Sequence, residues 1–188
     1  HTVVEVLHKD MPFIVDSVRM ELNQRNLRIH AINNAVLTVK RDENHQLSDL
    51  LNKDSRAKNA QHECLVSVEV DRHTNPQQLA ELEQSIRTVL EDVALVVDDF
   101  EPMMARCDDL HKEFGSAIKG LDKSDVTEVN AFVAWLKDHF TFLGYDEFTL
   151  VDREGDQQLE AVPGSQLGLL RYCDEHCRQS LVNEGNRD

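Results

Sequence analysis

The sequence lacks several features that would point to particular classes of protein. It contains no run of about 18 or more apolar residues, so no segment is predicted to span a membrane. Its four cysteines are too few and too scattered for a small disulfide scaffold. Basic residues are scarce, with 20 lysines and arginines against 35 aspartates and glutamates and a net charge of -15. This charge repels phosphate backbones and anionic headgroups, so we expect neither nucleic acid nor a membrane as a partner.

The motifs of common nucleotide-binding and catalytic sites are also missing. No GxGxxG or GxxxxGKS/T loop occurs, and neither does a GxSxG or HExxH motif. Cys173 and Cys177 flank His176, but a structural zinc site needs four ligands, and two free thiols on a polar helix explain this pattern. His8 follows a strand pattern and is interpreted as a solvated or capping residue. We therefore predict no catalytic residue, no bound cofactor and no metal in this chain.

The first 26 residues predict a strand followed by a helix. Residues 2–7 alternate and are rich in valine, as in a half-buried strand. Asp10 stands where it can cap a helix that has Pro12 in its first turn, and Asn26 can end that helix. The predicted helix carries an apolar stripe formed by Met11, Ile14, Val15, Val18 and Leu22.

A long strand and a polar connection are predicted next. Residues 27–40 have the pattern of a long strand, in which the pair Asn33-Asn34 suggests a bulge or a kink. Residues 42–60 are polar and charged, which predicts a connection with a short helical turn near residues 47–51.

The clearest strand pattern lies in residues 63–71, where one face is apolar and the other is polar. The following helix is predicted to begin with Asn75 as its cap and Pro76 in its first position. Apolar residues then recur at steps of three and four as far as Met104, which favours one long helix, although residues 94–100 also fit a short strand. We expect a common core formed by Ile14, Val18, Leu22, Val66, Val68, Val70, Leu82 and Ile86.

The last third of the chain predicts a linker, a helix and a hairpin. Residues 115–124 contain two glycines and resemble a linker, and residues 126–139 form an amphipathic pattern. Residues 140–151 and 159–162 predict the two strands of a hairpin. The order β-α-β-β-α at the start predicts an α+β fold, with helices on one face of a mainly antiparallel sheet.

These patterns divide the chain into three parts. Residues 1–100 are predicted to form an α+β domain, residues 101–125 a helical extension and linker, and residues 126–188 a helix plus hairpin that starts a second, incomplete module. Because the first residue is His1 and a strand pattern begins at once, we expect the chain to be a piece of a longer protein.

The motifs that carry a family resemblance lie at both ends of the chain. The segment VVEVLHKDMPFIVDSVRMELNQRNLRIHAINNAVLTV, residues 3–39, resembles the opening of an ACT domain, a ferredoxin-like layer that starts with a strand, an Asp-x-Pro turn and a helix. The stretches HKDMPFIVDSVRMELNQR, DHFTFLGYDEFTL and LGLLR, in this order, resemble the N-terminal regulatory region of the large bacterial NAD-specific glutamate dehydrogenases. The resemblance spans most of residues 1–171.

The resemblance implies the function of the longer protein. It implies a cytoplasmic, multidomain and oligomeric enzyme that oxidatively deaminates L-glutamate to 2-oxoglutarate and ammonia with NAD. The dehydrogenase core would lie outside this chain, which would be a non-catalytic regulatory and assembly module. Its expected partners are the rest of the parent chain, a homo-oligomer and an amino-acid effector. We expect the polar face of strand 63–71, or an edge of its sheet, to make a subunit or domain contact.

The ACT resemblance also implies an effector site at the first turn. Backbone N–H groups at the helix N-terminus can bind a carboxylate, and asparagine side chains can bind an amino group. Ligand-binding turns of this type commonly carry Gly where this chain has Phe13, so the ring would fill the pocket and favour a packing role. The alternative is an amino-acid-sensing module of this or another metabolic enzyme. The candidate effector-binding residues are Asp10, Met11, Pro12, Phe13, Ile14, Asn33 and Asn34.

Overall fold

The chain forms two compact units, which are described separately. A computed structural model describes residues 1–53, 55, 57–116, 123–153, 156–174 and 177–178. The first unit is His1–Ala94 and the second is Leu95–Asp188. The first unit combines a sheet with helices, which confirms the predicted α+β class. The finer division at residues 100 and 125 stays a prediction.

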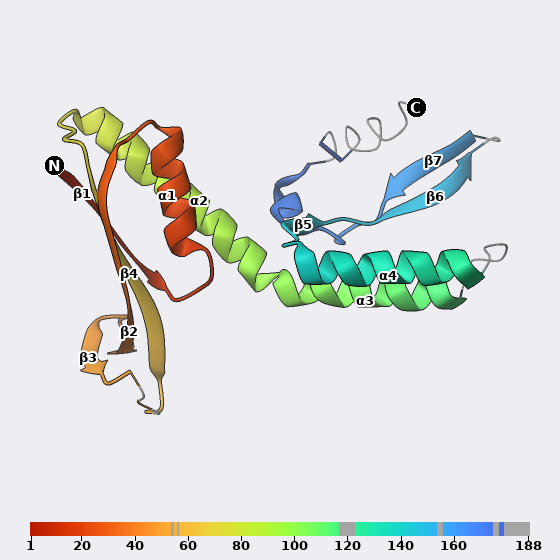
Figure 1. The fold of residues 1–188 in the computed structure, drawn as a ribbon, viewed down its shortest axis with the longest axis horizontal. Coiled ribbons are helices and arrows are strands. Elements are labelled where there is room, and N and C mark those ends of the chain that lie inside the picture. Colours follow the sequence, from red (N-terminus) through yellow and green to blue (C-terminus); the bar gives the residue numbers. More distant parts are fainter. Residues whose placement is uncertain (54, 56, 117–122, 154–155, 175–176, 179–188) are drawn as a thin grey trace. The chain divides into compact units, whose positions relative to one another are not determined.

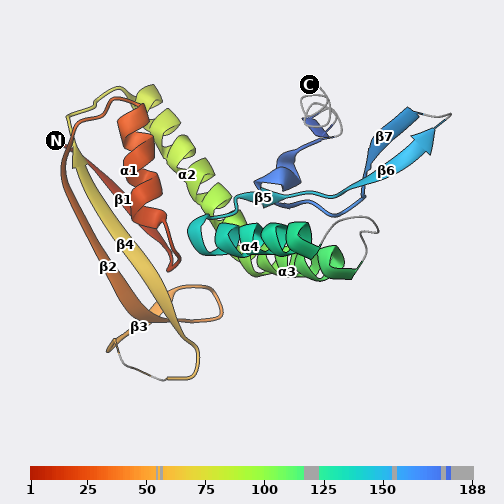
Figure 2. The same ribbon diagram turned by 45° about the vertical axis from the view of Figure 1, so that its right-hand side comes forward.

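The first unit contains a four-stranded antiparallel sheet. Its strands, in spatial order, are β1 (Thr2–Lys9), β4 (Ala60–Val70), β2 (Ile29–Arg41) and β3 (Leu47–Leu51). Helices α1 (Ile14–Gln24) and α2 (Pro76–Asp98) cover one face of this sheet (Figures 1 and 2). Strand β4 is therefore central, and β1 lies at an edge of the sheet.

The core of the first unit lies between the sheet and its two helices. Val66, Val68 and Val70 of β4 are fully buried and cluster with residues of both helices. This confirms the predicted register, in which alternate residues of the strand face the helices. Burying each of these side chains contributes roughly 1.5–3 kcal/mol to folding. The buried cluster consists of Val6, Ile14, Val18, Leu22, Cys64, Val66, Val68, Val70, Leu82, Ile86 and Leu90.

Helix α1 begins later than predicted. Asp10 does not cap it: the first helical residue is Ile14, and the backbone N–H of Asp10 still donates to the carbonyl of His62 on β4 at 2.9 Å. The cap position is instead Phe13, which has φ 71° and makes no side-chain cap hydrogen bond. At the other end Asn26 has φ 56° and its N–H donates to the carbonyl of Asn23 at 2.9 Å. Asn26 therefore ends the helix, as predicted.

The predicted bulge at Asn33-Asn34 was wrong. Both residues pair in regular register, Asn33 with Ser67 and Asn34 with Val66. The irregularity in this part of β2 lies at His30 instead, between the paired residues on either side of it. Asparagine alone is therefore a weak signal for a bulge, since β2 and β4 pair in regular register through both residues.

The helical turn predicted near residues 47–51 was also wrong, because this segment is strand β3. The side chain of Asp42 accepts hydrogen bonds from the N–H groups of Asn44 at 2.9 Å and Gln46 at 2.8 Å. This tight turn folds the chain back, so that β3 pairs with the end of β2.

Helix α2 begins as predicted and ends earlier. The side chain of Asn75 accepts a hydrogen bond from the N–H of Gln77 at 2.9 Å, and Pro76 is the first helical residue. Residues 94–98 are helical, which confirms the choice of helix over strand. The predicted long helix is interrupted at Asp99, and α3 (Phe100–Ser116) begins after it.

Among its described residues, the second unit contains two long packed helices and two small sheets. Helix α3 lies beside α4 (Lys123–His139), the amphipathic helix that the sequence predicted (Figures 1 and 2). Within the described ranges, the remaining elements are strands and one short 3₁₀ helix. They are β5 (Gly144–Tyr145), β6 (Phe148–Arg153), β7 (Asp156–Ala161), β8 (Leu167–Gly168) and η1 (Leu169–Tyr172).

The predicted hairpin is present in this unit. Strand β6 pairs with β7 in antiparallel register, and β5 pairs separately with β8. Residues 154–155, and residues 117–122 of the predicted linker, lie outside the described residues. Among the helices that the structure does describe, none combines the length and the apolar character needed to cross a bilayer.

Candidate functional site

The predicted effector turn is the short connection between β1 and α1. Ile14 is buried and Met11 packs partly against the core, so these two residues anchor the turn. Asp10 and Pro12 are not buried. The side chain of Phe13 is 51% exposed, so its ring does not fill an enclosed pocket. The turn is thus an open surface feature rather than a plugged cavity.

The backbone of Phe13 has a left-handed conformation, with φ 71° and ψ 0°. A side chain in this region costs roughly 1–2 kcal/mol, and Gly avoids this strain. The common Gly at this place in ligand-binding turns therefore has a conformational explanation besides access for a ligand.

The N-terminus of α1 offers partial complementarity to a carboxylate. It has no side-chain cap, so its first N–H groups are available to an anion. However, Asp16 in the first turn carries a negative charge and pairs with Arg19 at 3.1 Å. The carboxylate of Asp16 already interacts with the positive end of the helix dipole and repels a second anion.

Asn33 and Asn34 are distant from the turn, and their side chains lie on opposite faces of the sheet. Consecutive strand residues point to opposite faces of a sheet, so Asn34 faces the helices and Asn33 faces away. Lys9, the last residue of β1, pairs with Glu63 of β4, which pairs with Leu37 of β2. Asn34 is therefore about 10 Å across the sheet from Lys9 and about 10 Å further along it. The predicted effector residues do not converge on one compact site.

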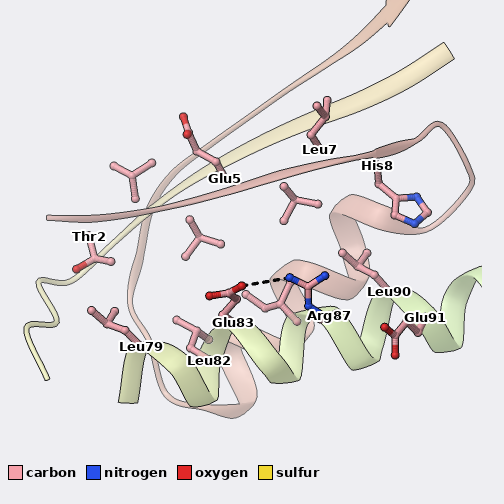
Figure 3. Close-up of a pocket in the computed structure, with 14 residues that line it drawn as sticks. Thr2, Glu5, Leu7, His8, Leu79, Leu82, Glu83, Arg87, Leu90 and Glu91 are labelled. Carbon is pink, nitrogen blue, oxygen red and sulfur yellow. Dashed lines mark hydrogen bonds and ion pairs between the residues drawn. The ribbon is translucent and has the colours of Figure 1, made fainter. Parts of the chain in front are cut away.

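A groove along β1 was not foreseen from the sequence. Its volume is about 500 Å³, and it lies between the outer edge of β1 and one side of α2 (Figure 3). Seven consecutive residues, 2–8, line it from the strand. From α2 it is lined by Leu79, Leu82, Glu83, Ile86, Arg87, Leu90 and Glu91.

The groove has two walls of different chemistry, one formed by a helix and the other by a strand. Its helical wall is apolar below and charged at the rim, where Glu83 and Arg87 form an exposed ion pair at 3.2 Å (Figure 3). Its other wall is a strand edge, which offers backbone donors and acceptors. Apolar pockets beside a free strand edge are the two elements of strand-addition recognition. The alternation in residues 2–7 predicted the strand that forms one wall. It could not predict the groove, because the pattern of a strand does not show which elements lie beside it.

In the second unit, the buried residue Asp99 is the centre of a polar cluster. Arg171 donates two hydrogen bonds to its carboxylate, and the N–H of Gly168 donates a third at 2.7 Å. The hydrogen bonds from Arg171 hold the pKa of Asp99 below its usual value. Sequence analysis missed this cluster, although Gly168 and Arg171 lie in the LGLLR motif that carries the family resemblance.

Asp146 and Arg178 form a buried ion pair in this unit. Their side chains are 4% and 8% exposed, and Nη2 of Arg178 lies 2.5 Å from the carboxylate. Ser165 also donates to Asp146, at 2.8 Å. Burial raises the pKa of Asp146, but the hydrogen bonds from Arg178 and Ser165 outweigh this effect and lower it overall. This ion pair links the segment at Asp146 to the segment at Arg178, 32 residues later in the chain.

The cysteines do not form the predicted set of free thiols. Cys173 and Cys177 are joined by a disulfide. Cys64 and Cys107 are free and buried, and burial raises the pKa of both thiols. Within the described part of the chain, no group of three or more His, Cys, Asp or Glu side chains is arranged to hold a metal ion.

Comparisons with known proteins agree with the motifs. Residues 1–86 match the family described as "Glutamate dehydrogenase, ACT1 domain". The chain is 42% identical over 183 residues to the NAD-specific glutamate dehydrogenase of Halomonas elongata, covering 96% of this chain and 11% of that protein. It is 42% identical over 172 residues to the NAD-specific glutamate dehydrogenase of Pseudomonas aeruginosa, covering 91% of this chain and 11% of that protein.

These matches confirm the resemblance that the sequence motifs indicated. The chain spans about 11% of the length of the curated relatives that it matches. Residues 1–86 match the ACT1 domain family of glutamate dehydrogenases, and nearly the whole chain is similar to NAD-specific members of that enzyme class.

Proposed function

We propose that this chain is a non-catalytic, N-terminal regulatory and assembly region of an NAD-dependent glutamate dehydrogenase. The observation that carries the proposal is the 42% identity over 96% of the chain to such an enzyme. The parent protein would oxidatively deaminate L-glutamate to 2-oxoglutarate and ammonia in the cytoplasm. NAD would bind in the parent protein outside these residues.

Two observations support a role other than catalysis. The described polar clusters, around Asp99 and Asp146, are closed ion pairs that link distant segments of the second unit. The sequence of the chain also has none of the phosphate-binding loops that a dinucleotide site commonly uses.

An assembly role is supported by the face of the sheet that α1 and α2 leave uncovered. On this face, Val3 and Leu7 are each 53% exposed and Leu65 of the central strand is 36% exposed. Apolar residues on an otherwise polar sheet face suit a contact with another domain or subunit. The proposed partners are the rest of the parent chain and further copies of the parent protein.

The alternative function is amino-acid sensing at the turn that precedes α1. The uncapped helix N-terminus and the half-exposed ring of Phe13 favour it, because both leave the turn accessible. The negative charge of Asp16 and the distant position of Asn34 count against it.

The enzyme assignment is tested with the full-length parent protein. We expect glutamate-dependent reduction of NAD by that protein and no such activity in the purified 188-residue chain. Deleting residues 1–94 should change the oligomeric state, measured by analytical ultracentrifugation, or the response to effectors. An isolated chain that reduces NAD would refute the non-catalytic role. A deletion that changes neither assembly nor effector response would refute the regulatory one.

The sensing alternative is tested by calorimetric titration of the full-length protein with glutamate and other amino acids. A lysine at the helix N-terminus should strengthen the binding of a carboxylate. Loss of binding in the Asp16→Lys variant would therefore not fit a carboxylate site. Tighter binding in the Asp16→Lys variant would support the site. Arg19→Ala serves as the control, because it removes the partner of Asp16 without adding a cation at the helix N-terminus.

A further inference from the structure

The outer edge of β1 presents a regular set of backbone hydrogen-bonding groups. In an antiparallel pair, every second residue bonds to the neighbouring strand and the others point away. The N–H of Asp10 donates to the carbonyl of His62, which places the even-numbered residues of β1 toward β4. The N–H and C=O groups of Val3, Glu5 and Leu7 therefore point to the open edge. In the described residues, β4 is the only strand that pairs with β1.

Helix α2 extends over this open edge. The groove between them is lined by seven strand residues and by Leu79, Leu82 and Leu90 of α2, among others (Figure 3). A ferredoxin-like β-α-β-β-α-β motif has a further strand after its second helix. Here α2 is followed by α3, and the later described strands pair only with one another. In its described residues, the first unit thus has the two helices of the motif but lacks its last strand.

We infer that this groove receives an added β-strand, supplied by a segment of the same parent polypeptide outside residues 1–188. This inference rests on the proposed function, because it requires the longer protein. The curated relatives provide such a chain, since the matched region is only 11% of their length. The added strand bonds to Val3, Glu5 and Leu7 and places alternate side chains against α2.

The small area of the groove favours a segment of the same chain over a separate molecule. A strand of seven residues is about 23 Å long, and the edge of a sheet is about 10 Å thick. This contact is several times smaller than the roughly 800 Å² per partner of a stable protein complex. A tethered segment avoids most of the entropy cost of association, because its effective concentration reaches the millimolar range.

Charge also disfavours a second copy of β1 in the groove. In an antiparallel arrangement that pairs Val3 with Leu7 of another copy, Glu5 lies directly opposite its own symmetry mate. Like charges in directly opposed positions destabilise a sheet. The incoming strand should instead have a neutral or basic residue opposite Glu5, and apolar residues at the alternate positions that face Leu79 and Leu82.

Amide hydrogen exchange with single-residue resolution tests the inference in the full-length parent protein. The even-numbered residues Val4 and Val6 are internal references, because they bond to β4. We expect the amides of Val3, Glu5 and Leu7 to be protected within about tenfold of these references. Fast exchange of the three odd-numbered amides, beside protected even-numbered ones, would overturn the inference.

Cross-linking identifies the segment. A photoreactive benzoylphenylalanine replaces Glu83 at the rim of the groove, and in a control protein it replaces Gln84, which does not line the groove. Mixed oligomers of isotopically light and heavy protein separate contacts within one chain from contacts between chains. We expect Glu83-specific cross-links within one chain to a single segment outside residues 1–188. Cross-links between chains, to residues 95–188, or from Gln84 alone would overturn the inference.

A proline substitution connects the two measurements. Glu5→Pro removes an N–H that points to the open edge, and proline is tolerated at such edge positions. Glu5→Ala is the matched control, because it removes the same side chain and keeps the N–H. We expect Glu5→Pro to reduce the Glu83-specific cross-link at least about tenfold and Glu5→Ala to retain it. Equal cross-linking in both variants would count against the inference. If Glu5→Pro does not fold, the hydrogen-exchange measurement on the unmodified protein still tests the inference. Neither the exchange nor the cross-linking result depends on whether the protein reduces NAD.

Discussion

Arg171 donates two hydrogen bonds to the carboxylate of Asp99, which lies 72 residues earlier in the chain, at distances of 2.5 and 2.8 Å. Asp99 interrupts the long helical pattern between α2 and α3, and Arg171 lies in η1. The ion pair therefore fixes a helix junction to the end of the small β5–β8 sheet within the second unit. The pair gives a physical role to a residue that sequence analysis treated as part of a continuous helix.

The first prediction concerns the pH dependence of this ion pair. Arg171 lowers the pKa of Asp99 in the folded state, so the pair contributes stability above the ordinary aspartate pKa of about 3.9. That contribution is lost as the pH falls through the lower folded-state pKa. We expect the stability of the second unit to fall as the pH drops below the ordinary aspartate pKa of about 3.9, and Asp99→Asn to remove part of this dependence.

Thermal unfolding followed by the fluorescence of Trp135, the single tryptophan, measures this effect. Asp99→Asn should also lower the melting temperature at neutral pH by a few degrees. Asp98→Asn is the control, because Asp98 is exposed and its neighbour carries the ion pair. An identical pH profile for Asp99→Asn and the parent chain would contradict the prediction.

The second prediction compares two glycines that both have positive φ. A Cβ added at Gly168 would lie 2.4 Å from the carbonyl oxygen of Leu143, whereas at Gly164 it would meet nothing within 4 Å. Gly164→Ala should therefore cost only the backbone strain, about 1–2 kcal/mol. Gly168→Ala should cost about 3 kcal/mol or more, because the backbone must also shift. Denaturant unfolding followed by Trp135 fluorescence measures both, and equal costs would show that the close contact relaxes freely.

Local sequence patterns predicted the core of the first unit correctly. Val66, Val68 and Val70 alternate with polar residues, and this period of two has one structural solution when one face is buried. The start of α2 was also predictable, since Asn75 and Pro76 satisfy the geometry of a helix N-terminus by themselves.

The features that were not predicted depend on contacts between distant residues. Strand β3 has the sequence LSDLL, which lacks β-branched residues, and it forms because the turn at Asp42 brings it against β2. The ion pair of Asp99 with Arg171 and the groove beside β1 depend on which segments become neighbours. The left-handed backbone of Phe13 had one usable signal, the common Gly at this place in related turns.

The third prediction concerns the number of reactive thiols. Because Cys173 and Cys177 form a disulfide, unreduced protein in denaturant should show two thiols per chain out of four cysteines. In the native state Cys64 and Cys107 should react slowly, because burial blocks access and raises their pKa. Titration with a chromogenic disulfide reagent measures both values, and prior reduction should give four thiols. Four thiols in denaturant before any reduction would refute the disulfide.

The last prediction concerns the backbone strain at Phe13. Both Phe13→Ala and Phe13→Gly remove the half-exposed ring, but only Gly relieves the left-handed conformation at φ 71°. Relief of roughly 1–2 kcal/mol exceeds the roughly 0.5–1 kcal/mol that glycine costs by adding freedom to the unfolded chain. We therefore expect Phe13→Gly to be more stable than Phe13→Ala by about 1 kcal/mol, measured by urea unfolding followed by circular dichroism.

The same pair of substitutions at Met20 provides the control. Met20 is 58% exposed in the middle of α1, where the helical backbone has no need of glycine. There Met20→Gly should be less stable than Met20→Ala by about 1 kcal/mol, because alanine has the higher helix propensity. The sign of the glycine–alanine difference should thus reverse between the two positions of one helix. If alanine is the more stable residue at both, the turn relaxes to an ordinary conformation, and the strain at Phe13 cannot explain why related turns carry glycine there.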